Sequence, residues 1–307
     1  MSPGANETSL EGGLARATWW ARLGDRVGDR LELTKPRIVA MVLVVTTLSY
    51  LLARKSGVPP STAWLTLPAV GGAAGGAATL NNYRDREADG ARSRTRERAL
   101  PAGRVSSISA LVQGLTLVVA GVAVAALGVG LLTSLLLLLA TCLYVLVYTP
   151  LRGHPRFTRF VGAVAGAIPA LCGWAAAGSG LGAGAWAVFA LLFAWQYPHA
   201  EVVSWMSDRQ DDAAARGGLS AGGGAVAGRL VALCLGTVAV SLLPVLLAEA
   251  GSVYVVGAAL FGLALLITAV RFALVPLPGR ARALRIALVM FLPLILVVAV
   301  AAARLPV

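Results

Sequence analysis

The sequence is short of charged residues, and this shortage excludes most soluble folds. Only 13% of the 307 residues are Asp, Glu, Lys or Arg, whereas 58% are hydrophobic and the mean hydropathy is +0.79. Apolar runs of about twenty residues recur along the chain, and a helix of that length crosses the ~30 Å hydrocarbon core of a bilayer. No soluble core could bury so much apolar surface. The composition therefore predicts a polytopic membrane protein.

Two further absences narrow the fold class. The short strands of alternating polarity that a membrane barrel needs do not occur, and backbone polar groups cannot stay unpaired in lipid, so helices are the expected spanning element. Cys142, Cys172 and Cys234 stand singly inside apolar runs without ligand-like spacing, which predicts no disulfide. We expect an all-α fold with about nine transmembrane helices around a central cavity. The predicted spans are residues 37–52, 63–82, 106–126, 128–148, 158–178, 183–206, 225–248, 252–275 and 284–303.

The chain divides into a cytoplasmic N-terminal segment, residues 1–32, and a transmembrane domain, residues 33–307. The first thirty residues lack the apolar core of a signal peptide. Leu23, Val27 and Leu31 recur at intervals of four after Trp19 and Trp20, which predicts a short helix at the membrane interface.

The positive charges indicate the orientation in the membrane. Of the 26 Lys and Arg residues, 23 fall before the first span or in even-numbered loops, and Arg54, Lys55 and Arg304 are the exceptions. Because positive loops stay in the cytoplasm, we expect a cytoplasmic N-terminus in a bacterial inner membrane. The net charge of +12 then reflects topology and contact with anionic lipid, not nucleic-acid binding.

Acidic residues are scarce, and they gather in two clusters. None occurs from Arg98 through Ala200. Four lie in the second loop and four near the sixth loop, where both clusters follow the cytoplasmic end of a span. Four spans separate the clusters, which suggests two related four-helix halves that face one cavity. The cluster members are Asp85, Glu87, Asp89 and Glu97, then Glu201, Asp208, Asp211 and Asp212.

The spacing of these acids predicts a metal site. Asn81, Asp85 and Asp89 are four residues apart, so a helix continuing out of the second span carries them in one row, and Asp208 and Asp212 repeat the interval. Like charges at this spacing repel, so a cation between them is expected. Mg²⁺ accepts one or two carboxylates together with phosphate oxygens, which predicts a diphosphate substrate. Nearby guanidinium groups would bind its oxygens, and the candidates are Arg84, Arg94, Arg96, Arg98 and Arg104. A solvated loop whose arginines serve topology alone is the open alternative.

With these residues in view, the chain resembles the UbiA superfamily of intramembrane prenyltransferases, whose first signature, Asn-x3-Asp-x3-Asp, is met by Asn81, Asp85 and Asp89. Within it, the chain is most similar to the protoheme IX farnesyltransferase branch. The similarity covers roughly residues 33–220 and includes LTKPRI (33–38), RTRERALPAGRVS (94–106), YTPL (148–151), VGAVAGAIPALCGW (161–174) and WQYPH (195–199). Two positions depart from the branch: Arg152 replaces a lysine, and the second acidic motif, WMSDRQDDAAARGGL, is about three residues longer.

This resemblance implies a reaction and its ligands. The substrates would be farnesyl diphosphate and haem B, and two Mg²⁺ ions would bridge the diphosphate. The metal ligands would come from Asn81, Asp85, Asp89, Asp208, Asp211 and Asp212, although the altered second motif leaves the choice among the last three open. The cationic ligands of the substrates would be Lys35, Arg37, Arg84, Arg94, Arg98, Arg104 and Arg152. A contact with a haem A synthase is also implied.

His199 is the histidine at membrane depth, and an ionisable residue there indicates function. Its imidazole would approach the haem iron or orient the acceptor, whereas a structural histidine bonded to a neighbouring helix is the alternative. Two other functions also remain open. One is prenyl transfer to a quinone-ring or chlorin precursor, and the other is membrane transport.

Overall fold

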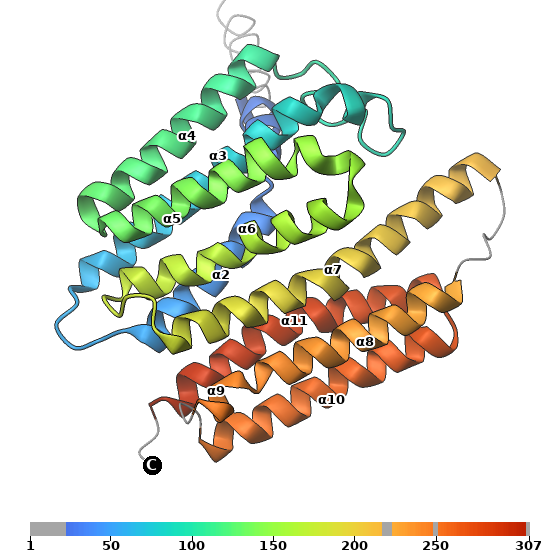
Figure 1. Cartoon of the computed structure of the whole chain (residues 1–307). Coiled ribbons are helices and arrows are strands. Elements are labelled where there is room, and N and C mark those ends of the chain that lie inside the picture. Colours follow the sequence, from blue (N-terminus) through green and yellow to red (C-terminus); the bar gives the residue numbers. More distant parts are fainter. Residues whose placement is uncertain (1–22, 217–222, 248–250, 305–307) are drawn as a thin grey trace, which may run out of the picture.

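The structure, a computed structural model, describes residues 23–216, 223–247 and 251–304, apart from the side chains of residues 152, 153, 155, 209–216 and 223–225. The described part is helical throughout (Figure 1). A helix over residues 23–33 precedes the bundle. The bundle consists of α2 (Pro36–Ala53), α3 (Pro60–Gly90), α4 (Ser107–Gly128), α5 (Leu131–Cys142), η1 (Leu143–Tyr148), η2 (Pro150–Gly153), α6 (Pro155–Ala176), α7 (Ala183–Arg216), α8 (Gly223–Ser241), α9 (Leu243–Leu246), α10 (Ser252–Leu274) and α11 (Pro278–Ala302).

Each of the nine predicted spans overlaps a helix of this bundle, which confirms the all-α fold, although the seventh span is divided between α8 and the short α9. Seven described helical segments are long and apolar enough to cross a membrane. The two longest helices, α3 and α7, are not among them, because glycine, threonine and proline lower the hydropathy of the apolar part of α3, and the WQYPH segment lowers that of α7. Proline stands in the first turn of α2, α3, α6 and α11, where its missing N–H leaves no bond unmade.

The fourth predicted span, residues 128–148, differs from a regular helix. It begins as α5 and changes at Leu143 into a π-helix, η1, which ends at Tyr148. The wider turn moves Tyr144 and Tyr148 into a stacked pair with ring centroids 5.3 Å apart. Short π segments inside helices are frequent at functional sites, and this one borders the cavity described below.

The most extensive helix contact joins α3 to α4. A Cβ atom at Gly76 would lie 2.7 Å from the Gly114 carbonyl oxygen, and one at Gly121 would lie 2.5 Å from the Ala69 carbonyl oxygen. Glycine at these positions lets the two backbones approach, as in other membrane helix pairs. The seam therefore fixes the position of α3, which carries the first acidic cluster.

Figure 1 shows the C-terminal ends of α3 and α7 at the same end of the bundle, where α2, α6, α8 and α11 begin. Most members of both acidic clusters lie in the last turns of these two helices, so the structure places the clusters on one side of the membrane domain. The helix over residues 23–33 lies at this end as well, and its Leu23, Val27 and Leu31 are exposed, as expected for an interfacial helix.

Candidate active site

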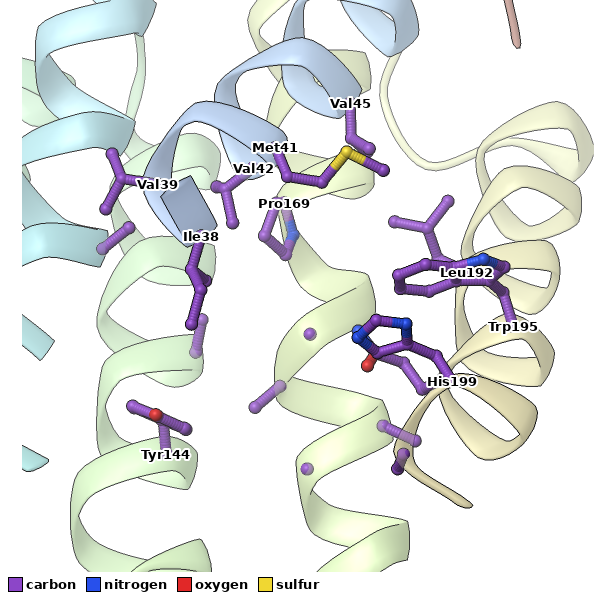
Figure 2. A pocket seen from close by; sticks show the side chains of 18 of the residues that line it. Ile38, Val39, Met41, Val42, Val45, Tyr144, Pro169, Leu192, Trp195 and His199 are labelled. Carbon is purple, nitrogen blue, oxygen red and sulfur yellow. The ribbon is translucent and has the colours of Figure 1, made fainter. Parts of the chain in front are cut away.

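A cavity of about 780 Å³ opens inside the bundle. Its walls come from α2, α3, α5, η1 and α6 of the first half of the chain and from α7 and α11 of the second half. Most of the lining is aliphatic, and Figure 2 shows Ile38, Met41 and Val45 of α2 on its wall. This size and apolar character suit a largely hydrophobic ligand.

The polar part of the cavity wall carries positive charge. Four cationic side chains line it, and no Asp or Glu among the described residues does. Lys35 and Arg37 come from the start of α2, Arg159 from α6 and Arg285 from α11. An apolar cavity with four cations on its wall is suited to a ligand that has a hydrocarbon part and anionic groups.

Lys35 has an uncommon backbone conformation. Its φ of 52° and ψ of 63° lie in the left-handed region, and it is the only non-glycine residue with positive φ in the described chain. Such a conformation costs about 1–2 kcal/mol for a residue with a Cβ, so it often marks a functional position. Here it directs the ammonium group to Asn81, where Nζ donates to Oδ1 at 2.7 Å.

Asn81 is completely buried and connects several elements. Its Oδ1 also accepts from the Tyr144 hydroxyl at 3.3 Å, and its Nδ2 donates to Asp85 Oδ2 at 2.9 Å and to Thr149 Oγ1 at 3.1 Å. Since Lys35 and Tyr144 both line the cavity, Asn81 joins the cavity wall to the acidic row of α3. The Asn81 side-chain amide is oriented with Oδ1 toward the Lys35 ammonium and Nδ2 toward Asp85.

The predicted row on α3 is present and buried. Asp85 is 7% exposed and Asp89 is 5% exposed, and they follow Asn81 on the same face of the helix. Arg98 Nη1 lies 2.9 Å from Asp89 Oδ2, which provides the cation expected beside these acids. Buried carboxylate and amide oxygens are hard donors, so the row has the chemistry that Mg²⁺ requires. The metal-binding role itself stays a prediction.

The second acidic cluster is less defined. Asp208 is exposed on α7, with its Oδ2 3.5 Å from Ser204 Oγ. Asp211 and Asp212 belong to α7, but their side chains lie outside the described residues. Among the described side chains, no three of His, Cys, Asp and Glu converge on a common point. A shared metal site between the clusters is therefore a prediction that rests on the common end of α3 and α7.

The predicted arginines fall into different environments. Arg84 donates to the Val145 carbonyl oxygen at 3.2 Å and so supports η1. Arg104 lies at the helix over residues 23–33, where Nε is 2.9 Å from Asp29 Oδ1 and Nη2 is 3.4 Å from Glu32 Oε2. The hydrogen bond that Arg104 donates to Asp29 raises the pKa of Arg104. The structure therefore keeps Arg104 away from the cavity wall and engages it with the N-terminal helix.

Arg94 and Arg96 are exposed in the loop after α3, and neither lines the cavity. Arg152 belongs to η2, and its side chain lies outside the described residues. Of the seven predicted cationic ligands, the structure thus brings Lys35 and Arg37 to the cavity. Arg159 and Arg285 also line the cavity, although in the sequence they are indicative only of the orientation in the membrane.

His199 lines the cavity from α7 (Figure 2). Its ring stacks on Trp195, with centroids 4.6 Å apart and an interplanar angle of 15°. The Trp195 indole N–H donates to the Leu288 carbonyl oxygen at 2.7 Å, which holds the stacked pair against α11. Nδ1 of His199 is buried and has no hydrogen-bond partner in the described structure. The imidazole as a whole lines the cavity, and its buried Nδ1 is bonded to no neighbouring helix of the described structure, which favours contact of the ring with a ligand over a purely structural role.

Tyr144 and Thr149 are further site residues that the sequence pattern does not assign, since Tyr144 lies outside the YTPL motif at residues 148–151 and the motif gives Thr149 no partner. Their position depends on the π turn, because Thr149 Oγ1 donates to the Tyr144 carbonyl oxygen at 2.9 Å and accepts from Asn81. No local periodicity predicts this contact. The YTPL motif itself was the available signal.

Comparison with known proteins identifies the family of the chain. Residues 42–295 match the UbiA prenyltransferase family. The chain is 36% identical over 286 residues to the protoheme IX farnesyltransferase of Solibacter usitatus, covering 87% of this chain and 96% of that protein. It is 43% identical over 242 residues to the enzyme of the same name from an Anaeromyxobacter species, covering 77% and 80%.

Solved structures share the fold at lower identity. A digeranylgeranylglyceryl phosphate synthase superposes with a TM-score of 0.71 at 16% identity, over 91% of this chain and 99% of that one. A UbiA homologue from Archaeoglobus fulgidus, bound to DMAPP and Mg²⁺, gives a TM-score of 0.61 at 17% identity, over 91% and 100%. At this identity the likeness shows the fold.

Proposed function

The chain is a member of the UbiA prenyltransferase family, and we propose that it transfers the farnesyl group of farnesyl diphosphate to a vinyl group of haem B, giving haem O. The observation that carries the proposal is the cavity whose cationic wall meets the buried acidic row through the contact between Lys35 and Asn81. The relatives named protoheme IX farnesyltransferase support haem B as the acceptor. The family assignment favours prenyl transfer over the transport alternative.

The acidic row and the cations beside it would bind the diphosphate. Asn81, Asp85 and Asp89 offer the oxygen donors for Mg²⁺, and Asp208, Asp211 and Asp212 stay predicted ligands from α7, with two ions as the predicted number. Bound Mg²⁺ would neutralise the charge of the leaving diphosphate. Arg94, Arg98, Arg104 and Arg152 stay predictions, and the contacts of Arg98 and Arg104 support a role in holding the loop and N-terminal helix around the row.

Lys35 and Arg37 would stabilise the same charge from the cavity wall. The C1–O bond of farnesyl diphosphate breaks and its electron pair leaves with the diphosphate, so negative charge grows where the ammonium of Lys35 is already fixed. The allylic cation left behind is attacked by the π electrons of the haem vinyl group. Water then adds to the resulting cation and releases a proton, which completes the hydroxyethylfarnesyl side chain. The aliphatic wall delays capture of the first cation by bulk water.

His199 would hold the acceptor. Its imidazole lines the cavity, where it is suited to approach the haem iron or to orient the macrocycle, and stacking on Trp195 restricts the ring to one plane. We place the charged end of the bundle, with the N-terminus, in the cytoplasm of a bacterial inner membrane, because 23 of 26 basic residues belong to that end. The contact with a haem A synthase stays a prediction.

The test is turnover by purified protein in liposomes. Haem B, farnesyl diphosphate and MgCl₂ are supplied, and the haem extract is analysed by mass spectrometry. We expect the mass of haem O, its loss after chelation of Mg²⁺, and a strong reduction in Asp85→Ala and Asp89→Ala variants that retain the wild-type unfolding temperature. Prenylation of a quinone-ring or chlorin precursor in place of haem B, by the same folded protein, would refute the proposed acceptor.

A further inference from the structure

Glu201 is a buried acid for which the proposed reaction has no use. It lies on α7, two residues after His199, and is 4% exposed. Its Oε1 accepts from Arg229 Nη2 of α8, and its Oε2 lies 3.0 Å from Arg159 Nη1 of α6. A carboxylate at this depth is unfavourable unless cations compensate it. One arginine would neutralise Glu201, so the second needs a separate explanation.

The two arginines differ in what else they face. Arg159 lines the cavity, whereas Arg229 does not. Glu201 Oε2 accepts no aligned hydrogen bond, so Arg159 meets it as a charge while its N–H groups are not consumed by it. Two guanidinium groups on one carboxylate leave a net positive charge. Glu201 thus fixes the flexible Arg159 side chain from behind and leaves its donors to a ligand in the cavity.

The position of Arg159 indicates which anion it meets. Lys35 lies beside the acidic row of α3, where a diphosphate with its metal would bind. The carboxylate that contacts Arg159 is already shared with Arg229, so this side offers a planar cationic fork in place of metal ligands. Such a fork matches a carboxylate. Haem B carries two propionates, and His199, which belongs to the proposed acceptor wall, lines the same cavity as Arg159.

We propose that Glu201 is a positioning residue that holds Arg159 on the cavity wall, where the guanidinium binds a propionate carboxylate of the porphyrin acceptor. The inference rests on the proposed function, since it specifies how that acceptor is held. A purely structural role, in which Glu201 only ties α6, α7 and α8 together, makes a different prediction. It would give the Arg159 and Arg229 variants the same phenotype, because each removes one ion pair from the same carboxylate.

The test compares Arg159→Gln with the matched control Arg229→Gln, and Glu201→Gln is the third variant. KM is measured separately for haem B and for farnesyl diphosphate in liposomes, and haem B dimethyl ester serves as an acceptor without free carboxylates. We expect Arg159→Gln to raise KM for haem B about tenfold or more, as loss of a charged hydrogen bond does. KM for farnesyl diphosphate should stay within about twofold. Glu201→Gln should change KM in the same direction, and Arg229→Gln should change KM for haem B less than Arg159→Gln does and leave KM for farnesyl diphosphate near wild type.

Measurements with haem B dimethyl ester distinguish a loss of propionate recognition from general damage to the protein. With the dimethyl ester, wild type and Arg159→Gln should have equal KM values, because the group that Arg159 binds is gone. An Arg159→Gln effect that persists on the ester, an effect on farnesyl diphosphate alone, or equal effects of Arg159→Gln and Arg229→Gln would overturn the proposal. If Glu201→Gln does not fold, the comparison of Arg159→Gln with Arg229→Gln still tests the proposal. If wild type makes no haem O, the proposed function fails on its own, and absorbance titration with haem B and its ester still tests the carboxylate contact.

Discussion

The contact between Lys35 and Asn81 gives the sharpest prediction, because activity and stability should respond differently to two substitutions. Lys35→Met keeps the Cβ and removes the ammonium, whereas Lys35→Gly removes both. Both variants lose the 2.7 Å bond to Asn81 Oδ1 and the charge on the cavity wall. A hydrogen bond from a charged donor is worth about 1.5–3 kcal/mol. If that stabilisation acts on the departing diphosphate, kcat/KM should fall about 10- to 150-fold in both variants.

Stability should separate the two variants. At φ 52° a residue with a Cβ carries about 1–2 kcal/mol of strain, which glycine relieves. Glycine has more conformational freedom in the unfolded chain, and this lowers the stability of the Lys35→Gly variant by about 0.5–1 kcal/mol. Lys35→Gly should therefore be more stable than Lys35→Met by about 0.5–1 kcal/mol. The Tyr144 hydroxyl still donates to Asn81 Oδ1 in both variants, which limits the loss of stability that the two variants share.

The assay is haem O formation at varied farnesyl diphosphate, together with thermal unfolding of each detergent-solubilised variant. The expected order of unfolding temperature places Lys35→Gly above Lys35→Met, with equally low kcat/KM. Wild-type kcat/KM in either variant would show that the ammonium takes no part in the reaction. A Lys35→Met variant more stable than Lys35→Gly would show that the left-handed conformation carries no strain.

Three further predictions concern the acidic row and the helix packing. Asp85→Asn should reduce kcat at least a hundredfold and leave the unfolding temperature within a few degrees, and higher Mg²⁺ in the turnover assay should restore little of it. Gly121→Ala should lower the unfolding temperature, because its Cβ would meet α3 backbone at 2.5 Å, while the control Gly236→Ala, with no atom within 4 Å, should not. Trp195→Phe should lose the bond to the Leu288 carbonyl oxygen and about 1 kcal/mol of stability, measured by thermal unfolding, and should weaken haem B binding in an absorbance titration.

The fold was predictable to the level of the helices. Apolar runs of membrane-spanning length and the asymmetry of basic residues depend only on neighbouring residues, so they can be read without any packing information. Helix boundaries were less accurate where the local turn changes, as in η1, because a π turn depends on what surrounds it. The nine predicted spans therefore fall on helices, while the π segment was unforeseen.

The candidate site was predictable in part. The interval of four fixes Asn81, Asp85 and Asp89 in one row on any helix, and their burial confirms that the row faces inward. Arg104 shows the limit of this reasoning, since its place in a charged loop suggested phosphate, whereas packing pairs it with Asp29 and Glu32. A long flexible cation reaches several partners, and sequence spacing does not choose among them.

By itself the sequence determined that this is a helical membrane protein of the UbiA type, with its acids at one end and an amide and two carboxylates in register. Those properties follow from hydropathy, helical periodicity and short sequence motifs. Only the tertiary structure decided that Lys35 meets Asn81 across 46 residues, and that Arg159 faces a cavity while Arg229 does not. The reason is physical: helix periodicity fixes the face on which a residue lies, but the packing of helices decides which faces meet.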